Sequence, residues 1–180
     1  EEQERSFTQS QSQFGPSDGQ FEAFRRNGAG YAQIVGVEDA LAWNASARLD
    51  DNQTFGSFGT YRFGAAYELP SATRVRGAIG TAFREPTFFQ NYASGFVRGN
   101  PGLKPERTRS VEVGLEQRAG DRVTLSATWF AQRFQDVIDF TFATALPTDP
   151  NYFNIAAANA DGLEVDATVV LTPWASIGGN

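Results

Sequence analysis

Gly99-Asn100-Pro101-Gly102-Leu103-Lys104-Pro105-Glu106 is the stretch from which the fold of this chain is first inferred. It lies between residues 73–84 and 106–118, two segments with the residue pattern of β-strands. Pro101 and Pro105 hold φ at about −65° and each lacks a backbone donor, so this stretch cannot continue the ladder of a neighbouring strand. It therefore predicts a long loop with rigid corners between two long strands.

Apolar and polar residues alternate along much of the remaining chain, as they do in strands with one apolar face. In residues 41–50, for example, Leu41, Trp43 and Leu49 fall on one face, whereas Asn44 and Arg48 fall on the other. The segments with this alternation are residues 41–50, 60–69, 74–84, 110–116, 123–132 and 163–171. A further strand begins near residue 177, and together these segments predict about seven or eight long strands.

The connections between these strands are predicted to be short on one side and long on the other. Residues 70–72, 119–121 and 172–173 are tight turns, whereas residues 84–105 and 139–152 are long. This arrangement is typical of outer-membrane barrels. The strands also approach the roughly 9–11 residues that a tilted membrane strand needs. The sequence therefore predicts an all-β fold: a segment of an antiparallel transmembrane β-barrel, with short periplasmic turns and long extracellular loops.

Large aromatic side chains are predicted at strand ends on the apolar faces, where they would form the aromatic girdles of a membrane barrel. They are Trp43, Tyr61, Tyr67, Trp129 and Trp174. The alternative is that these rings form the core of a soluble β-sandwich. Residues 1–27 are mostly polar and are predicted to form an extracellular loop, with a turn at residues 15–19.

The composition excludes several classes of function. The net charge is −6 and the isoelectric point is about 4.7, which argues against a nucleic-acid partner. The chain has no Cys and no His, so disulfides, thiolate metal sites and the usual general base are excluded. No cofactor is expected. The mean hydropathy of −0.37 is compatible with a barrel, because only alternate residues of a barrel strand face lipid.

A series of short blocks resembles the barrel domain of TonB-dependent outer-membrane receptors. The blocks are Arg48-Leu49-Asp50-Asp51, Gly80-Thr81-Ala82-Phe83-Arg84-Glu85-Pro86, Gly99-Asn100-Pro101 with Leu103-Lys104-Pro105-Glu106, Glu112-Val113-Gly114-Leu115-Glu116, and Asn154 with Gly162-Leu163-Glu164. They occur in order between Leu41 and Pro173, and the cobalamin-receptor branch is the nearest.

The resemblance implies a barrel of about 22 strands around a plug. Residues 1–180 would then be part of the barrel domain, and the plug domain and the closing C-terminal strand would be absent. It also implies a bacterial outer-membrane receptor, not an enzyme, that takes up cobalamin or a ferric siderophore and contacts TonB through the missing N-terminal region. The chain has no Met and shows no leader at Glu1, and we accordingly expect an internal fragment of a longer protein.

The candidate ligand-binding residues gather in the predicted loop between residues 84 and 105. They are Phe88, Phe89, Asn91, Tyr92, Phe96 and Arg98. Such a group can form an aromatic surface that captures a large planar ligand at the mouth of the barrel. The alternative is that the rings pack the loop against its neighbours. Tyr152 and Phe153, beside Asn151 and Asn154, offer the same two interpretations in the next loop.

Acidic residues on the polar faces do not form a convincing catalytic pair. Glu112 and Glu116 are four residues apart on one strand, hence roughly 13 Å, which exceeds the roughly 5–9.5 Å of glycosidase carboxylates. We expect these two residues, with Glu164 and Asp166, to line the lumen and pair with arginines or with the plug. Asp50 and Asp51 are adjacent on a strand and point apart, so they are too few for a calcium site.

The sequence is also compatible with two other classes of function. The first is a passive porin-like or adhesive β protein without energy coupling. The second is an enzyme, for which the sequence offers no credible triad. A plug domain upstream of this chain, preceded by a TonB-contacting segment, distinguishes an active transporter from both.

Overall fold

The computed structural model of the chain describes residues 2–12 and 15–180. These residues form strands and one short helix, which are named here in chain order. The elements are β1 (Glu2–Ser12), β2 (Gly15–Arg25), β3 (Asn27–Glu38), β4 (Leu41–Asn52), β5 (Gly56–Leu69), β6 (Thr73–Arg84), α1 (Phe88–Tyr92), β7 (Glu106–Ala119), β8 (Val123–Phe140), β9 (Tyr152–Thr172) and β10 (Ala175–Gly179).

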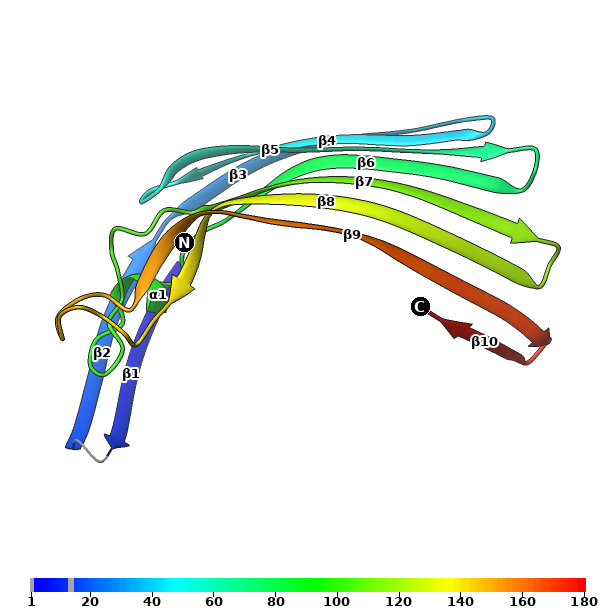
Figure 1. The fold of residues 1–180 in the computed structure, drawn as a ribbon. Coiled ribbons are helices and arrows are strands. Elements are labelled where there is room, and N and C mark those ends of the chain that lie inside the picture. The colour runs from blue at the N-terminus through cyan, green and yellow to red at the C-terminus, as the bar shows by residue number, and fades with distance from the viewer. Residues whose placement is uncertain (1, 13–14) are drawn as a thin grey trace.

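The strands from β3 to β10 form one curved antiparallel sheet of 8 strands, in which each strand pairs with its neighbours in the sequence (Figure 1). Strands β1 and β2 form a separate two-stranded sheet. The prediction of an all-β, antiparallel barrel segment with seven or eight long strands is therefore confirmed. The sheet is open, with β3 and β10 as its edge strands in the described part of the chain.

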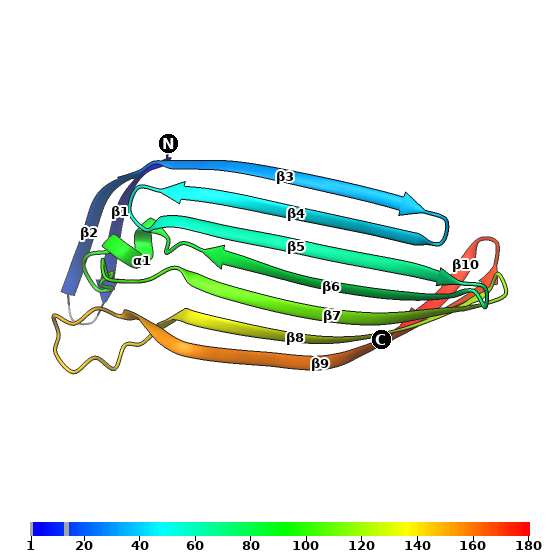
Figure 2. The ribbon, with the colours of Figure 1, turned by 90° about the horizontal axis from the view of Figure 1, so that it is seen from above.

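The two ends of the large sheet differ, as the connection lengths predict (Figure 2). At one end, tight turns join β3 to β4, β5 to β6, β7 to β8 and β9 to β10. At the other end lie α1, the β1–β2 hairpin and the loops that join β6 to β7 and β8 to β9. We refer to these as the turn end and the loop end.

The two faces of the large sheet separate apolar from polar residues, which confirms the alternation. The apolar side chains project outward and are exposed: Leu49, Tyr61, Phe63, Tyr67, Leu69, Val75, Val113, Leu115, Leu125, Trp129, Leu163, Val165 and Leu171. The opposite face lines a hollow of 670 Å³ with many polar side chains, among them Asn44, Arg62, Arg76, Glu112, Gln132, Glu164 and Asp166. We call these the outer face and the inner face. A soluble β-sandwich, the alternative considered for the aromatic residues, would instead bury the apolar face.

Strand β3 was not predicted, because its faces do not separate apolar from polar residues. Its register with β4 places Gly30 and Gly36 on the outer face and Tyr31 and Val35 on the inner face. The Trp43 ring covers Gly36 across the strand pair, since a Cβ atom on Gly36 would lie 2.4 Å from that ring. Strand β3 is thus held by its pairing with β4 and not by a pattern of its own.

The prediction of a loop over residues 1–27, with a turn at residues 15–19, is wrong for the part that the structure describes. Residues 15–19 belong to β2, which pairs with β1 from Glu2↔Arg25 to Ser12↔Gly15. Glu1 and residues 13–14 lie outside the described residues. In the last part of β2, Gly19, Phe21, Ala23 and Arg25 are buried or half-buried, whereas Gln20, Glu22 and Phe24 are exposed. The packed face mixes apolar residues with glycine and a cation, so its alternation in the sequence is weak.

Of the five aromatic residues predicted to form girdles at strand ends, only three lie near the turn end. Trp43 and Tyr67 lie near the turn ends of β4 and β5, and Trp174 lies in the turn between β9 and β10. Trp129, in contrast, lies near the middle of β8, because β8 continues to Phe140 and is longer than predicted. Tyr61 is likewise inside β5 and not at its end.

The best-buried apolar side chains gather at the loop end. Phe58, Phe88, Ala93 and Leu103 are buried there, whereas the outer face of the sheet is exposed along its length. None of the described residues forms a helix long and apolar enough to cross a membrane. The packed core of this chain therefore lies at the loop end, where the loops meet.

Candidate ligand-binding site

The long loop between β6 and β7 begins with the short helix α1. Thr87 caps it, since its side chain accepts a hydrogen bond from Gln90 N while the Gln90 side chain accepts one from Thr87 N. This reciprocal arrangement is a capping box, and the spacing of Thr87 and Gln90 in the sequence is the signal for it, which the sequence prediction missed. The helix places Phe88 and Asn91 inward and Tyr92 at the surface.

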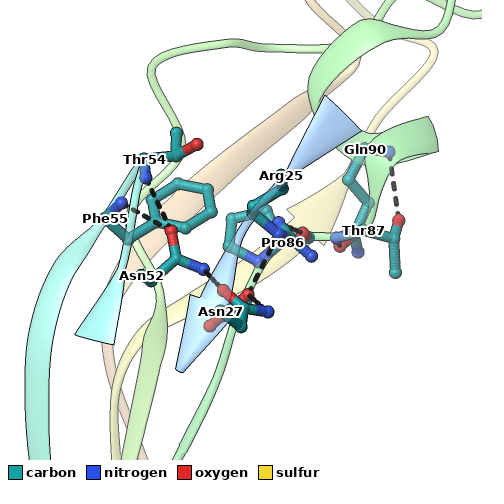
Figure 3. A network of polar contacts seen from close by, with 9 residues as sticks. Arg25, Asn27, Asn52, Thr54, Phe55, Pro86, Thr87 and Gln90 are labelled. Atoms are coloured by element: carbon teal, nitrogen blue, oxygen red, sulfur yellow. Dashed lines mark hydrogen bonds and ion pairs between the residues drawn. The ribbon is translucent and has the colours of Figure 1, made fainter. Parts of the chain in front are cut away.

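Arg25, the last residue of β2, fastens the hairpin to this loop (Figure 3). Its Nη1 donates to the carbonyl oxygen of Pro86 at 3.0 Å, and its Nε lies 3.2 Å from a carboxylate oxygen of Glu85. Its guanidinium also lies over the Phe88 ring, 4.7 Å from the centroid. Arg25 is buried and Pro86 is fully buried. One cation thus joins two segments about sixty residues apart in the sequence.

Asn52 and Asn27 extend this network to the turn between β4 and β5 (Figure 3). The Oδ1 atom of Asn52 accepts hydrogen bonds from Thr54 N at 2.7 Å and Phe55 N at 2.9 Å. Its Nδ2 donates to Asn27 Oδ1, and Asn27 Nδ2 donates to Glu85 at 3.5 Å. The start of β3, this turn and the long loop are therefore held together by side chains that the sequence analysis did not single out.

Two asparagines, Asn151 just before β9 and Asn154 near its start, hold the long loop between β6 and β7 at Arg98 and at Lys104. Arg98 N donates to Asn151 Oδ1 at 2.8 Å, and Asn151 Nδ2 donates to the Thr141 carbonyl at 2.8 Å. Lys104 N donates to Asn154 Oδ1 at 2.8 Å, and Asn154 Nδ2 returns a bond to the Lys104 carbonyl at 3.0 Å. These side chains replace the strand partners that this loop lacks, so the stretch from Gly99 to Glu106 has an architectural role.

Gly99 is required by the closeness of its backbone to α1. A Cβ atom at this position would lie 2.5 Å from the backbone of Asn91 and Tyr92. At Gly102, by comparison, a Cβ atom would meet only Asn100 Oδ1, at 3.2 Å. The first contact requires the backbone to move, whereas the second needs only a small shift of a side chain.

We expect Gly99→Ala to destabilise the loop by about 1–3 kcal/mol, the usual cost of overpacking. In the whole protein, amide hydrogen exchange in α1 should then be about tenfold faster or more, since about 1.4 kcal/mol corresponds to a factor of ten. Gly102→Ala is the matched control and should leave the exchange of α1 near the wild-type rate. Equal acceleration by the two variants would contradict the close-approach explanation.

Six aromatic rings form a continuous chain across the loop end. Successive centroids along the chain lie between 4.6 and 6.4 Å apart. In order, the rings are Phe21, Phe89, Tyr152, Phe140, Phe142 and Phe96. They come from the hairpin, α1, β9, β8 and the two long loops, and they end at the surface, where Phe96 is 59% exposed and Phe142 is 65% exposed. Contacts in this range are favourable for aromatic pairs.

The structure divides the six predicted site residues into two groups. Phe88 is 6% exposed, and Asn91 is 2% exposed and donates to the Asn100 carbonyl at 3.0 Å. Phe89 lies within the chain of rings, and the backbone of Arg98 is bonded to Asn151. Tyr92 and Phe96 are exposed. Phe142, which the sequence analysis did not single out, extends this exposed group, and its place in a predicted long loop was the available signal.

Two titratable groups at the loop end have shifted pKa values. Two hydrogen bonds from the Arg84 guanidinium, at 2.6 and 2.7 Å, hold the pKa of the Glu106 carboxyl below its ordinary value, although partial burial opposes this shift. A hydrogen bond from Ile138 N to Glu106 acts in the same direction as Arg84. Burial raises the pKa of the Tyr152 hydroxyl. Glu106 therefore stays charged and links β6, β7 and β8.

The four acidic residues expected to line the lumen, Glu112, Glu116, Glu164 and Asp166, lie on the inner face by their register. Glu112, Glu164 and Asp166 line the hollow there, and Asp166 accepts a hydrogen bond from Ser126 at 3.2 Å. Asp50 is bound by two nitrogens of Arg48, whereas Asp51 accepts a hydrogen bond from Ser57 at 2.8 Å. Within the described residues, no group of three or more acidic side chains is arranged to hold a metal ion.

An antiparallel meander with an apolar outer face, a polar hollow, tight turns at one end and structured loops at the other defines a segment of a transmembrane β-barrel. The model of the TonB-dependent receptor-like β-barrel family matches residues 3–180. The chain belongs to this family and is part of a protein of the bacterial outer membrane.

Individual relatives agree with this assignment. The chain is 32% identical over 150 residues to a vitamin B12 transporter, BtuB, of Photobacterium profundum, a match that covers 79% of this chain and 23% of the relative. The siderophore receptor PirA of Pseudomonas aeruginosa has a TM-score of 0.72 and 21% identity, over 90% of this chain and 33% of PirA. The copper transporter OprC has a TM-score of 0.68 and 18% identity, over 91% of this chain and 29% of OprC. The two structures establish the fold, and the chain spans about a quarter of the length of the curated relative.

Proposed function

We propose that this chain is the ligand-receiving part of an outer-membrane receptor that takes up a bulky, scarce ligand by TonB-coupled active transport. The ligand is cobalamin or a ferric siderophore. The plug domain, the segment that contacts TonB and the closing strand lie outside residues 1–180, in the remainder of a longer protein. No covalent step is involved, so the protein is a transporter and not an enzyme.

The observation that carries this proposal is the combination of a barrel wall with a loop end built as one packed unit. The inner face is polar, and an aqueous or plugged lumen requires this. The Arg25 network and the chain of rings order the loops above this wall, and ordered loops lose less freedom when a ligand binds. Sequence similarity to a vitamin B12 transporter favours cobalamin, and the siderophore receptor shares the fold.

We assign first contact with the ligand to the exposed end of the predicted site. Tyr92, Phe96 and Phe142 present ring surface to solvent at the loop end. Phe88 and Asn91 are buried beneath this surface, and Phe89 packs within the chain of rings. Arg98 positions the loop through its backbone hydrogen bond to Asn151. Exposed rings on an ordered support suit a large ligand with a planar apolar surface, because such rings give contact area at a low cost in conformational entropy.

Phe96→Ala combined with Phe142→Ala should weaken ligand binding by the whole receptor by about tenfold, since each aromatic contact contributes about 0.5–1.5 kcal/mol. The measurement is the Kd for cyanocobalamin and for a panel of ferric siderophores. Leu146→Ala is the control, because Leu146 is exposed in the same loop and forms none of the ring contacts. Unchanged affinity in the double variant would remove this pair from the site.

Transport itself is tested with the full-length parent in cells starved of cobalamin or of iron. We expect rescue of growth in one of the two conditions, and loss of that rescue when TonB is deleted. Rescue in neither condition would exclude both named ligands. Rescue that persists without TonB would support the passive, porin-like alternative instead.

A further inference from the structure

The outer face carries a cluster of arginines beside the loop end. The register of β7 and β8 places Arg109 directly opposite Arg133, and places Arg107 opposite Gln135. All of these side chains are exposed. They share the outer face with Val113 and Trp129, which are four residues further toward the turn end on the same two strands. We call Arg107, Arg109 and Arg133 the outer arginine cluster.

The height of this cluster coincides with the outer border of the membrane. Arg109 and Arg133 are each ten residues from the turn that joins β7 to β8. Ten residues give about 33 Å of strand at roughly 3.3 Å per residue, or about 23 Å along the membrane normal at a tilt of roughly 45°. The apolar band of a membrane barrel is about 25 Å tall. The cluster therefore lies level with the headgroups of the outer leaflet.

No carboxylate neutralises the charges of the cluster within the described part of the chain, although the Arg107 guanidinium lies over the Phe58 ring, 5.5 Å from its centroid. Other arginines of the sheet form ion pairs with carboxylates at 2.6 to 3.7 Å, namely Arg48, Arg74, Arg84 and Arg118. Among the described residues, no carboxylate lies within 4.0 Å of the cluster, although the register brings Asp161 to the same face, one position diagonal to Arg133. Like charges directly opposite each other destabilise a strand pair. Within the described residues, the positive charge of the cluster is therefore not balanced by a carboxylate.

The surface beside the cluster has a hollow that can receive an anion. A hollow of 490 Å³ is lined by all three arginines together with Tyr61, Thr81 and Gln135. Guanidinium groups bind phosphate through paired hydrogen bonds, and hydroxyl and amide groups suit a sugar. The apolar outer face continues below the hollow with Val113 and Trp129, where acyl chains would lie.

We propose that the outer arginine cluster binds the phosphate groups of a phosphorylated glycolipid headgroup in the outer leaflet. The lipid neutralises the like charges of Arg109 and Arg133, and its acyl chains cover the apolar face beneath. This site is separate from the ligand site at the loop end and does not depend on which ligand is transported. It binds the receptor to its membrane at a defined height.

The test uses the purified full-length receptor in a neutral detergent, titrated with lipopolysaccharide and followed by native mass spectrometry. Each arginine near an anionic lipid surface should contribute about a fivefold gain in affinity, so replacing all three with Gln should weaken binding about 100-fold. The control replaces Arg62 and Arg76 with Gln. Both lie on the inner face, and their replacement should leave lipopolysaccharide binding unchanged.

A second measurement separates the proposal from a general loss of folding. In lipid-free detergent, Arg133→Gln should be at least as stable as the wild type, because it relieves the repulsion from Arg109. With lipopolysaccharide present, the wild type should melt at the higher temperature, because a ligand stabilises the state that it binds. Equal binding of dephosphorylated lipopolysaccharide would overturn the proposal, and so would binding of inorganic phosphate without the lipid or an equal loss in the control.

Discussion

Arg25→Ala is expected to separate the β1–β2 hairpin from the long loop between β6 and β7. The substitution leaves the Glu85 carboxylate and the buried Pro86 carbonyl without the hydrogen bonds and charge that Arg25 supplies. Breaking a buried ion pair by removing one partner costs about 3–5 kcal/mol. In the whole protein, amide exchange in α1 and in β2 should accelerate by about a hundredfold or more, since roughly 1.4 kcal/mol is a factor of ten. Ligand affinity should fall with it, because the loops would no longer be ordered before binding.

Arg25→Lys is the matched control for this experiment. It keeps the positive charge but loses the planar fork that reaches Glu85 and Pro86 together and lies over the Phe88 ring. We expect an intermediate effect from this variant. If Arg25→Ala left the amide exchange of both α1 and β2 unchanged, the contacts of Arg25 with Glu85 and Pro86 would contribute nothing to the stability of the loop end. Acceleration throughout the large sheet would indicate general misfolding and not local release.

The second large effect is expected on the outer face of the barrel wall, at Val113. Val113 is exposed on the outer face of β7, between Gly77 of β6 and Trp129 of β8, and lies near the middle of the membrane-crossing part. Val113→Arg should destabilise the full-length barrel by about 2–4 kcal/mol, the cost of Arg or Lys at the bilayer midplane. The measurement is the free energy of unfolding from lipid vesicles, supported by the amount of folded protein in the outer membrane.

Gln132→Arg provides the control for the face assignment. Gln132 lies on the inner face and lines the polar hollow with Glu112 and Glu164, so an arginine there stays hydrated and near opposite charge. We expect a change of less than about 1 kcal/mol, the usual range for surface positions. If the two variants had equal costs, or if the order were reversed, the assignment of the lipid-facing surface would be wrong.

The strands from β4 to β9 were predictable from the sequence because a strand with one lipid-facing side alternates apolar and polar residues along its own segment. Leu41, Trp43 and Leu49 share a face wherever β4 lies in the sheet, since successive side chains of a strand point to opposite sides. The uneven connection lengths and the prolines at positions 101 and 105 are equally local, and they identified the loop end. Strand β3 was not predicted, because Tyr31 and Val35 place apolar side chains on its inner face and so obscure the alternation.

The candidate site was predictable only in part, for the same reason. The aromatic residues of the long loop drew attention through their number, but the sequence does not show that Phe88 is buried under Arg25 or that Phe96 meets Phe142. Those contacts join residues tens of positions apart, and they depend on how the hairpin, α1 and the two long loops pack at the end of the sheet.

The sequence by itself therefore determined that this chain forms a barrel wall. The signals were residues that alternate between the lipid-facing and lumen-facing sides, and blocks that resemble those of a family of outer-membrane receptors. Only the tertiary structure showed the contacts of Arg25 with the long loop, the chain of rings, and the position of Arg109 opposite Arg133. Alternation along a strand depends on the geometry of one chain segment, whereas a contact across strands or loops depends on register and packing. A shift of register by one residue would move every side chain of a strand to the other face, and local sequence does not record which distant segments meet.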